Sequence, residues 1–200
     1  MTKQLQLPEN PYDLFKEWLT MAEESEPNDP NAMCLATTSK DGYPNARMVL
    51  LKGLDERGFV FYTNAESRKG QELDDNDYAA LCFHWKSLRK QVRVQGKVVE
   101  IDSEEADQYY ATRHRGSRIG AWASKQSRPL ESMKHFEDFL ERYEKEFEGI
   151  DDIPRPDYWK GFRVIPDKIE FWVDGEYRLH QRYVYTATGE GQWKTGMLYP

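Results

Sequence analysis

The sequence is short of cysteine, of long apolar runs and of targeting signals. Two cysteines, Cys34 and Cys82, occur in 200 residues, and both lie in apolar stretches. This count excludes a disulfide framework and favours buried thiols in a reducing compartment. No apolar run approaches the roughly 20 residues of a membrane span, and the first residues lack the basic and apolar regions of a signal peptide. We therefore expect a cytoplasmic protein with no membrane partner.

Positive charge is also scarce, because 28 basic residues face 35 acidic ones and the formal net charge is -7. A nucleic-acid-binding protein would carry a continuous basic stripe, so nucleic acid is the least expected partner. Basic clusters in this chain are local features. We predict no metal site. The length favours one domain over residues 1–200, in which residues 1–9 form a flexible N-terminal segment.

Aromatic residues are plentiful, at 14% of the chain. They fit a β-rich core or a site that stacks planar rings. Apolar alternation broken by short turns predicts strands at residues 32–39, 46–53, 59–64, 78–85, 91–101, 158–166, 168–175, 177–187 and 192–200. Such closely spaced antiparallel strands suggest a small barrel or sandwich, in which the late strands join the sheet of the early ones.

Helical patterns lie before and between these strands. Asn10 as N-cap, Pro11 at the first helical position and an apolar stripe predict a first helix over residues 10–24. Further helices are expected from Ser67, behind a Ser103 cap, over residues 117–124 and behind Pro129. Strands, then helices, then strands indicate an α+β fold.

Two basic clusters have the spacing of anion sites. Arg68 and Lys69 lie in the first turn of a helix, where the partial positive charge of the helix end disfavours cations. With the Ser67 hydroxyl and free backbone amides they could hold a phosphate, although a solvated basic turn remains an alternative. Tyr109 and Arg113 share a helical face, with Ser117 following after Gly116, and could hold a second anion. Spacing alone favours an exposed helix end for this second cluster.

A third cluster lies near the C-terminus. In a strand, Arg178, His180 and Arg182 would share one face, with Leu179 and Gln181 on the other. Two guanidinium groups beside a histidine suggest an anion or a polarisable ring between them. An exposed strand face paired with acidic neighbours is the alternative.

Several motifs in order resemble the pyridoxamine 5'-phosphate oxidase family, from about Asn10 to Pro200. They are RMVLLK (47–52), FYTN..SRK (61–69), QVRVQGK (91–97), SRIGAWASKQS (117–127), FWVDGEYRLHQR (171–182) and the closing W......P (193–200). The resemblance implies a homodimeric split β-barrel with flanking helices and with FMN held at the subunit interface.

The resemblance also implies roles for individual residues. The flavin site would comprise Arg47, Met48, Val49, Leu50, Leu51, Lys52, Tyr62, Thr63, Arg68, Lys69, Gln91, Gln126, Ser127, Trp172 and Arg182, with Gln126 and Ser127 from the partner subunit. The substrate phosphate would contact Lys52, Tyr109, Arg113 and Ser117. Arg178 and His180 would lie over the substrate ring as the catalytic pair, Arg178 orienting the ring and His180 donating or accepting an aligning hydrogen bond.

The implied activity is the FMN-dependent oxidation of pyridoxamine 5'-phosphate and pyridoxine 5'-phosphate to pyridoxal 5'-phosphate. Dioxygen would be the acceptor and hydrogen peroxide the second product, in vitamin B6 biosynthesis and salvage. Two other functions stay open. A split-barrel flavin oxidoreductase with another substrate would keep Arg68 and Lys69 but would not need Tyr109, Arg113 and Ser117. A carrier of flavin or pyridoxal phosphate would bind without turnover.

The chain departs from the family pattern at three places. The longer N-terminal segment that usually closes over the substrate is expected to be absent or replaced by MTKQLQLPEN. Gln181 stands where Asp is usual, and Met197 where Arg is usual. In addition, Arg47 and Lys52 differ in strand parity, so a straight strand would point them to opposite faces. A bulge, or a ligand that wraps the strand end, would reconcile them.

Overall fold

The computed structural model describes residues 5–200, and its first element is the predicted N-terminal helix. Helix α1 (Pro11–Ser25) begins where expected, because the Asn10 side chain accepts a hydrogen bond from the Tyr12 amide and Pro11 lies in the first turn. Phe15 and Trp18 of its apolar stripe are fully buried, and Leu19 is partly buried. No helix among residues 5–200 is long and apolar enough to cross a membrane.

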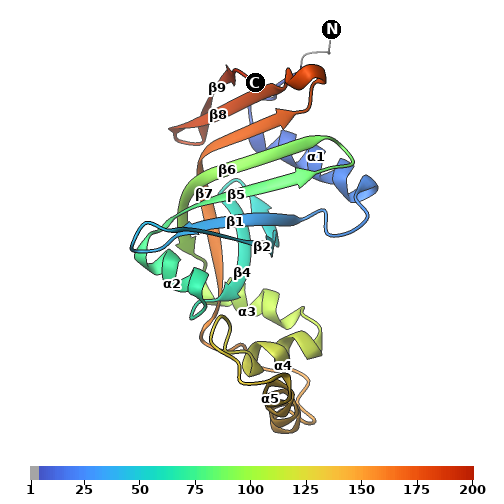
Figure 1. The fold of residues 1–200 in the computed structure, drawn as a ribbon, viewed down its shortest axis with the longest axis vertical. Coiled ribbons are helices and arrows are strands. Elements are labelled where there is room, and N and C mark those ends of the chain that lie inside the picture. The colour runs from blue at the N-terminus through green and yellow to red at the C-terminus, as the bar shows by residue number, and fades with distance from the viewer. Residues whose placement is uncertain (1–4) are drawn as a thin grey trace.

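One curved antiparallel sheet carries the rest of the fold (Figure 1). Its strands are β1 (Ala32–Thr38), β2 (Pro44–Leu50), β3 (Gly53–Asp55), β4 (Gly58–Asn64), β5 (Tyr78–Trp85), β6 (Lys90–Glu100), β7 (Trp159–Val173), β8 (Gln181–Gly189) and β9 (Gln192–Leu198). The order is β2-β1-β5-β6-β7-β4-β3, with β8 paired to β7 and β9 to β8. The late strands therefore join the early ones, as predicted.

Strand β7 is longer than the sequence indicated. Residues 158–166 and 168–175 were expected to form two strands, but a single strand of 15 residues pairs with β4, β6 and β8. Pro166 does not end it, because the register shifts opposite Gln95 and Gly96 and leaves Asp167 as an extra residue. Bulges are where sheets tolerate proline. A Cβ on Gly96 would lie 2.0 Å from the Ile165 carbonyl oxygen, so only glycine fits beside the bulge.

The remaining helices are α2 (Arg68–Asp75), α3 (Ser103–Ala111), α4 (Arg115–Ala123) and α5 (Met133–Glu146). Ser67 caps α2 as predicted. Two expected starts are wrong: α3 is capped by the Asp102 carboxylate, and α5 begins behind a Ser132 cap rather than behind Pro129. Helices α3, α4 and α5 gather at the end of the molecule that lies away from the two termini (Figure 1).

The prediction of a strand over residues 177–187 is wrong for its first four residues. Glu176–Arg178 form a 3-10 turn, and Tyr177 and Arg178 have positive φ angles of 56° and 65°. The Leu179 amide donates to the Glu176 carbonyl at 3.0 Å. A Cβ on Gly175 would lie 2.1 Å from the Leu179 carbonyl oxygen, so Gly175 lets the turn close this tightly. Arg178 and His180 therefore do not share a strand face with Arg182.

The two faces of the sheet differ in character. One face packs Phe59, Phe83 and Phe171 into the core against α1. The opposite face leaves Met48 64% and Leu50 37% exposed. Cys34 and Cys82 lie in register on neighbouring strands and are half-buried, so the prediction that both are core thiols is wrong.

The described part of the N-terminal segment contacts the sheet. The Leu5 amide donates to the Tyr183 hydroxyl at 3.1 Å, and the Tyr185 hydroxyl donates to the Pro8 carbonyl at 2.9 Å. Leu5 and Leu7 pack against the core. Residues 5–8 therefore lie against the sheet. The flexibility expected of residues 1–9 stays a prediction, and residues 1–4 lie outside the described residues.

Candidate active site

A cavity of about 550 Å³ opens between β2, β4 and helices α3 and α4. It brings together most of the predicted flavin and phosphate residues: Arg47, Met48, Val49, Leu50, Lys52, Tyr62, Thr63, Lys69, Tyr109, Arg113, Ser117 and Gln126. The two basic clusters that spacing indicated, some 40 residues apart in the chain, thus lie on one cavity through Lys69 and Arg113.

The end of β2 reconciles Arg47 with Lys52. The strand stops at Leu50, after which Leu51 turns into the core with 6% exposure. The Lys52 amide then donates to the Val60 carbonyl of β4 at 2.8 Å. Since the alternation ends with the strand, Arg47 and Lys52 can line the same cavity, and no bulge is needed. Leu51 itself is a core residue and does not line the cavity.

Lys69 lines the cavity and is partly buried. Its Nζ lies 2.7 Å from Gln126 Oε1, 3.2 Å from Thr63 Oγ1 and 3.3 Å from Ser67 Oγ. Burial, reinforced by the nearby Arg47 charge, lowers the pKa of Lys69 to about 8. None of these three contacts is an anion, so within residues 5–200 the ammonium group has no counter-charge at hydrogen-bond distance. A phosphate in the cavity would supply one.

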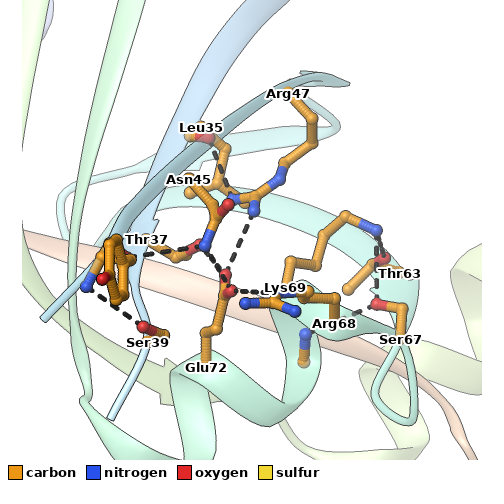
Figure 2. A network of polar contacts seen from close by, with 12 residues as sticks. Leu35, Thr37, Ser39, Asn45, Arg47, Thr63, Ser67, Arg68, Lys69 and Glu72 are labelled. Atoms are coloured by element: carbon orange, nitrogen blue, oxygen red, sulfur yellow. Dashed lines mark hydrogen bonds and ion pairs between the residues drawn. The ribbon is translucent and has the colours of Figure 1, made fainter. Parts of the chain in front are cut away.

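The Arg68 side chain points away from the cavity, so the two cations in the first turn of α2 have different partners. Its Nε donates to Glu72 Oε1 at 3.0 Å, one turn along α2, and Arg68 does not line the cavity. Glu72 is 3% exposed and is the centre of the polar network in Figure 2. Its carboxylate also accepts hydrogen bonds from Thr37 at 2.6 Å, Asn45 at 2.7 Å and Arg47 at 3.1 Å.

The network sets the charge of Glu72 and the position of Arg47. Burial alone would raise the pKa of Glu72, but the hydrogen bonds from Thr37 and Arg68 and the Arg47 charge outweigh it and leave the pKa below its usual value. Arg47 is tied further to the Leu35 carbonyl at 3.1 Å. Sequence analysis missed Glu72, because its partners on β1 and β2 are remote in the chain. The one local signal is its spacing of four from Arg68.

Arg113 is the cation of the second basic cluster, and it lines the cavity. Its guanidinium lies 4.9 Å from the Trp159 ring, and Trp159 and Tyr109 both stack on Tyr62. Burial lowers the pKa of Arg113. Nη1 of Arg113 is buried and has no hydrogen-bond partner among residues 5–200. A buried guanidinium N–H without an acceptor is costly, so this group favours an anion in the cavity over the exposed helix end that spacing suggested.

Other predicted residues lie away from the cavity. Gln91, Trp172, Arg178, His180 and Arg182 do not line it. They lie where β6 begins and β7 ends, near the termini and opposite α3 and α4 in Figure 1. Arg182 donates to Glu170 at 2.8 Å and to the Tyr199 carbonyl at 3.1 Å. The described chain therefore contains two groups of predicted site residues that it does not bring together.

Gln126 and Ser127 differ in their surroundings. The resemblance implied that they reach the flavin of a partner subunit, and within its own chain Gln126 contacts Lys69 and Thr63, at 2.7 Å and 3.4 Å. The role at the partner's flavin stays a prediction. Ser127 is exposed, has a positive φ of 68° and does not line the cavity.

Comparison with known proteins places this geometry in a family. Residues 19–147 match the family described as pyridoxamine 5'-phosphate oxidase, and residues 159–200 match the pyridoxine 5'-phosphate oxidase C-terminal dimerisation region. The pyridoxine/pyridoxamine 5'-phosphate oxidase of Brucella canis is 60% identical over 191 residues, which cover 95% of this chain and 94% of the relative. The chain belongs to the pyridoxamine 5'-phosphate oxidase family. It is accordingly an enzyme, an oxidoreductase.

Solved structures confirm the split-barrel α+β fold of this family member. PhzG from Burkholderia lata, crystallised with tetrahydrophenazine-1-carboxylic acid, has a TM-score of 0.89 and 31% identity, covering 96% of this chain and 94% of its own. An FMN-binding protein from Nostoc punctiforme, related to pyridoxamine 5'-phosphate oxidase, has a TM-score of 0.75 at 17% identity and covers 98% of this chain. The second likeness concerns the fold alone.

Sequence analysis also missed part of the cavity wall. Asn64, Gly120, Ala121, Ser124 and Trp159 line it. Trp159 opens β7 and stacks on Tyr62 with 5.0 Å between ring centroids. No helical or strand spacing relates Trp159 to Arg113, because β7 meets α3 only in the folded chain.

Proposed function

We propose that the chain oxidises pyridoxamine 5'-phosphate and pyridoxine 5'-phosphate to pyridoxal 5'-phosphate with FMN as cofactor. The amine, dioxygen and water would give the aldehyde, ammonia and hydrogen peroxide, and the alcohol and dioxygen would give the aldehyde and peroxide. The observation that carries the proposal is one cavity with two separate cationic groups. One is Lys69 with Arg47, and the other is Arg113, whose Nη1 has no hydrogen-bond partner among the described residues. A flavin phosphate and a substrate phosphate would occupy them.

The residues of the cavity fit FMN. Lys69 has no anionic hydrogen-bond partner in the described part of the chain and lies beside Ser67, which caps α2. The FMN phosphate would therefore bind Lys69 with Arg47 near the helix start. Met48, Val49 and Leu50 offer apolar contacts along β2. Bound FMN supplies the two-electron redox chemistry that side chains lack. The protein holds the substrate ring against the flavin and keeps both phosphates fixed.

The substrate phosphate would bind at the other end of the cavity. Arg113 would donate a hydrogen bond from Nη1, which has no partner within residues 5–200. The Tyr109 and Ser117 hydroxyls and the Lys52 ammonium would complete the contacts. The stacked rings of Tyr62 and Tyr109, 4.1 Å apart, hold that side of the cavity in place. A guanidinium and two hydroxyls match the several acceptor oxygens of one phosphate.

A homodimer would complete the site. A second copy would supply Gln91, Trp172, Arg178, His180 and Arg182, the group that one chain leaves away from its cavity, so that FMN lies at the interface. The match of residues 159–200 to a dimerisation region supports this assembly. The exposed apolar side chains Met48 and Leu50 on the outer face of the sheet support it as well. We place the enzyme in the cytoplasm, in pyridoxal phosphate biosynthesis and salvage.

The direct test is peroxide formation by the purified, FMN-loaded protein on addition of pyridoxine 5'-phosphate or pyridoxamine 5'-phosphate in air. We expect steady peroxide release with air, and bleaching of the flavin absorbance without it. A yellow protein that neither bleaches nor releases peroxide would overturn the proposal in favour of a carrier. Bleaching by a phenazine precursor and not by either B6 phosphate would overturn it in favour of a PhzG-like substrate.

A further inference from the structure

The turn between β7 and β8 holds His180 beside a fixed carboxylate. Asp174 follows the last residue of β7, and its backbone amide donates to the Arg89 carbonyl at 3.1 Å. The Arg89 guanidinium forms an ion pair with the Asp174 carboxylate, so both the backbone and the side chain of Asp174 are anchored to the β5–β6 turn. The side chains of Asp174 and His180 are only 18% and 21% exposed.

The surroundings of His180 favour one position for its proton. Nδ1 lies 3.0 Å from Asp174 Oδ1, and the Gly175 amide points its hydrogen at the same nitrogen from 3.2 Å, so the carboxylate and the amide compete for Nδ1. A bare Nδ1 could accept from Gly175, but its lone pair would then face a carboxylate. A protonated Nδ1 donates to that carboxylate instead, in a charge-assisted bond that is roughly twice as strong as a neutral one. The hydrogen bond at one ring nitrogen decides which tautomer a histidine adopts.

We propose that Asp174 is a positioning residue that keeps the proton of the neutral His180 ring on Nδ1 and thereby presents Nε2 to the substrate as an acceptor. The inference rests on the proposed function of His180 at the substrate ring. Trp172, whose ring centroid is 4.6 Å from that of His180, restricts the imidazole from one side. Gln181 is engaged elsewhere, because it accepts from the Tyr183 hydroxyl at 2.5 Å. Asp174 is thus the carboxylate that faces this histidine.

Nitrogen NMR of the FMN-loaded protein with ¹⁵N-labelled histidine tests the inference without turnover. The chain has four histidines, and the His180 signals are identified by their loss in His180→Asn. At a pH where the ring is neutral, we expect Nδ1 to carry the proton in the parent protein. Asp174→Ala should shift the ring towards the Nε2–H form, and Asp174→Asn, whose amide oxygen can still accept, should shift it less. Asp167→Ala, an exposed aspartate on the same strand, is the control and should change nothing.

Kinetics connect the proton position to the reaction. Asp174→Ala should keep its FMN but reduce the rate constant of anaerobic flavin reduction by about tenfold, since misorientation at the reacting ring is costly. The inference would be overturned if the His180 ring of the parent carries its proton on Nε2. It would also be overturned if Asp174→Ala leaves the proton on the same nitrogen as in the parent. If the tautomer of His180 depends on Asp174 but the protein does not oxidise B6 phosphates, the proposed function is wrong and the positioning role of Asp174 still holds.

Discussion

At the scale of single residues, Glu72 explains an arrangement that helix electrostatics disfavours. Arg68 and Lys69 begin α2 at its positive end, yet they do not act as a pair. Glu72 takes Arg68 on one oxygen and Arg47 on the other, while Lys69 turns into the cavity. The buried Glu72 carboxylate therefore neutralises Arg68, and Lys69 stays available to a ligand in the cavity.

Replacing Glu72 with Gln should destabilise the protein. The amide removes the charge from a buried site that receives four hydrogen bonds, and it leaves Arg47 without its ion pair. Loss of such charged hydrogen bonds costs about 1.5–3 kcal/mol. Urea unfolding measures the change, with Asp74→Asn, exposed on the same helix, as the control. Equal unfolding midpoints for Glu72→Gln and the parent would show that the network contributes no stability.

The affinity for FMN should fall at alkaline pH because of Lys69. Its pKa of about 8 means that the free protein loses this cation as the pH rises past 8, and phosphate binding must then restore the proton. The affinity should decline above that pH with a limiting slope of about tenfold per pH unit. Quenching of flavin fluorescence measures it. Lys69→Met should bind about one to two decades more weakly and lack this decline. A parent affinity that stays constant from neutral to alkaline pH would contradict the assignment.

At the scale of elements, the parts that sequence predicted are those fixed by local pattern. Strand β5 matches its predicted range of 78–85, because its apolar alternation is uninterrupted. Lys69 was singled out from its place in the first turn of α2. Spacing marked Arg113 as a candidate but favoured an exposed helix end for it, and α3 in fact ends at Ala111, before Arg113. The parts that were missed depend on contacts across the fold. Pro166 stays within β7 only because β6 offers a bulge, and the turn at Arg178 forms because Gly175 passes close to Leu179.

Replacing Gly70 in α2 with Ala should destabilise the protein, although Ala has the higher helix propensity. A Cβ on Gly70 would lie 2.0 Å from the Ala65 carbonyl oxygen, whereas Gly120 in α4 has no atom within 4 Å of that position. Gly120→Ala should therefore gain about 0.5–1 kcal/mol, and Gly70→Ala should lose about 1–3 kcal/mol through overpacking. Thermal unfolding of the flavin-free protein compares them. A Gly70→Ala variant as stable as Gly120→Ala would refute the close approach of Gly70 to the Ala65 carbonyl.

At the scale of the whole molecule, the chain separates the predicted site residues into two groups. The cavity residues lie among β2, β4, α3 and α4, while Arg178 and His180 lie at the turn after β7. Because the described chain does not join these groups, a symmetric pair of chains would form two equivalent composite sites. The central claim is therefore that catalysis requires a cavity from one chain and a turn from another.

Mixing two inactive variants tests this claim most directly. Arg113→Ala damages the cavity and Arg178→Ala damages the turn, so each homodimer has two defective sites. After unfolding and refolding together at equal concentration, half of the dimers would be mixed, and each mixed dimer would hold one intact site. We predict recovery of about 25% of the parent activity, above the sum of the separately refolded variants. Activity that stays at that sum, although mass spectrometry detects mixed dimers, would show that each chain builds its active site alone.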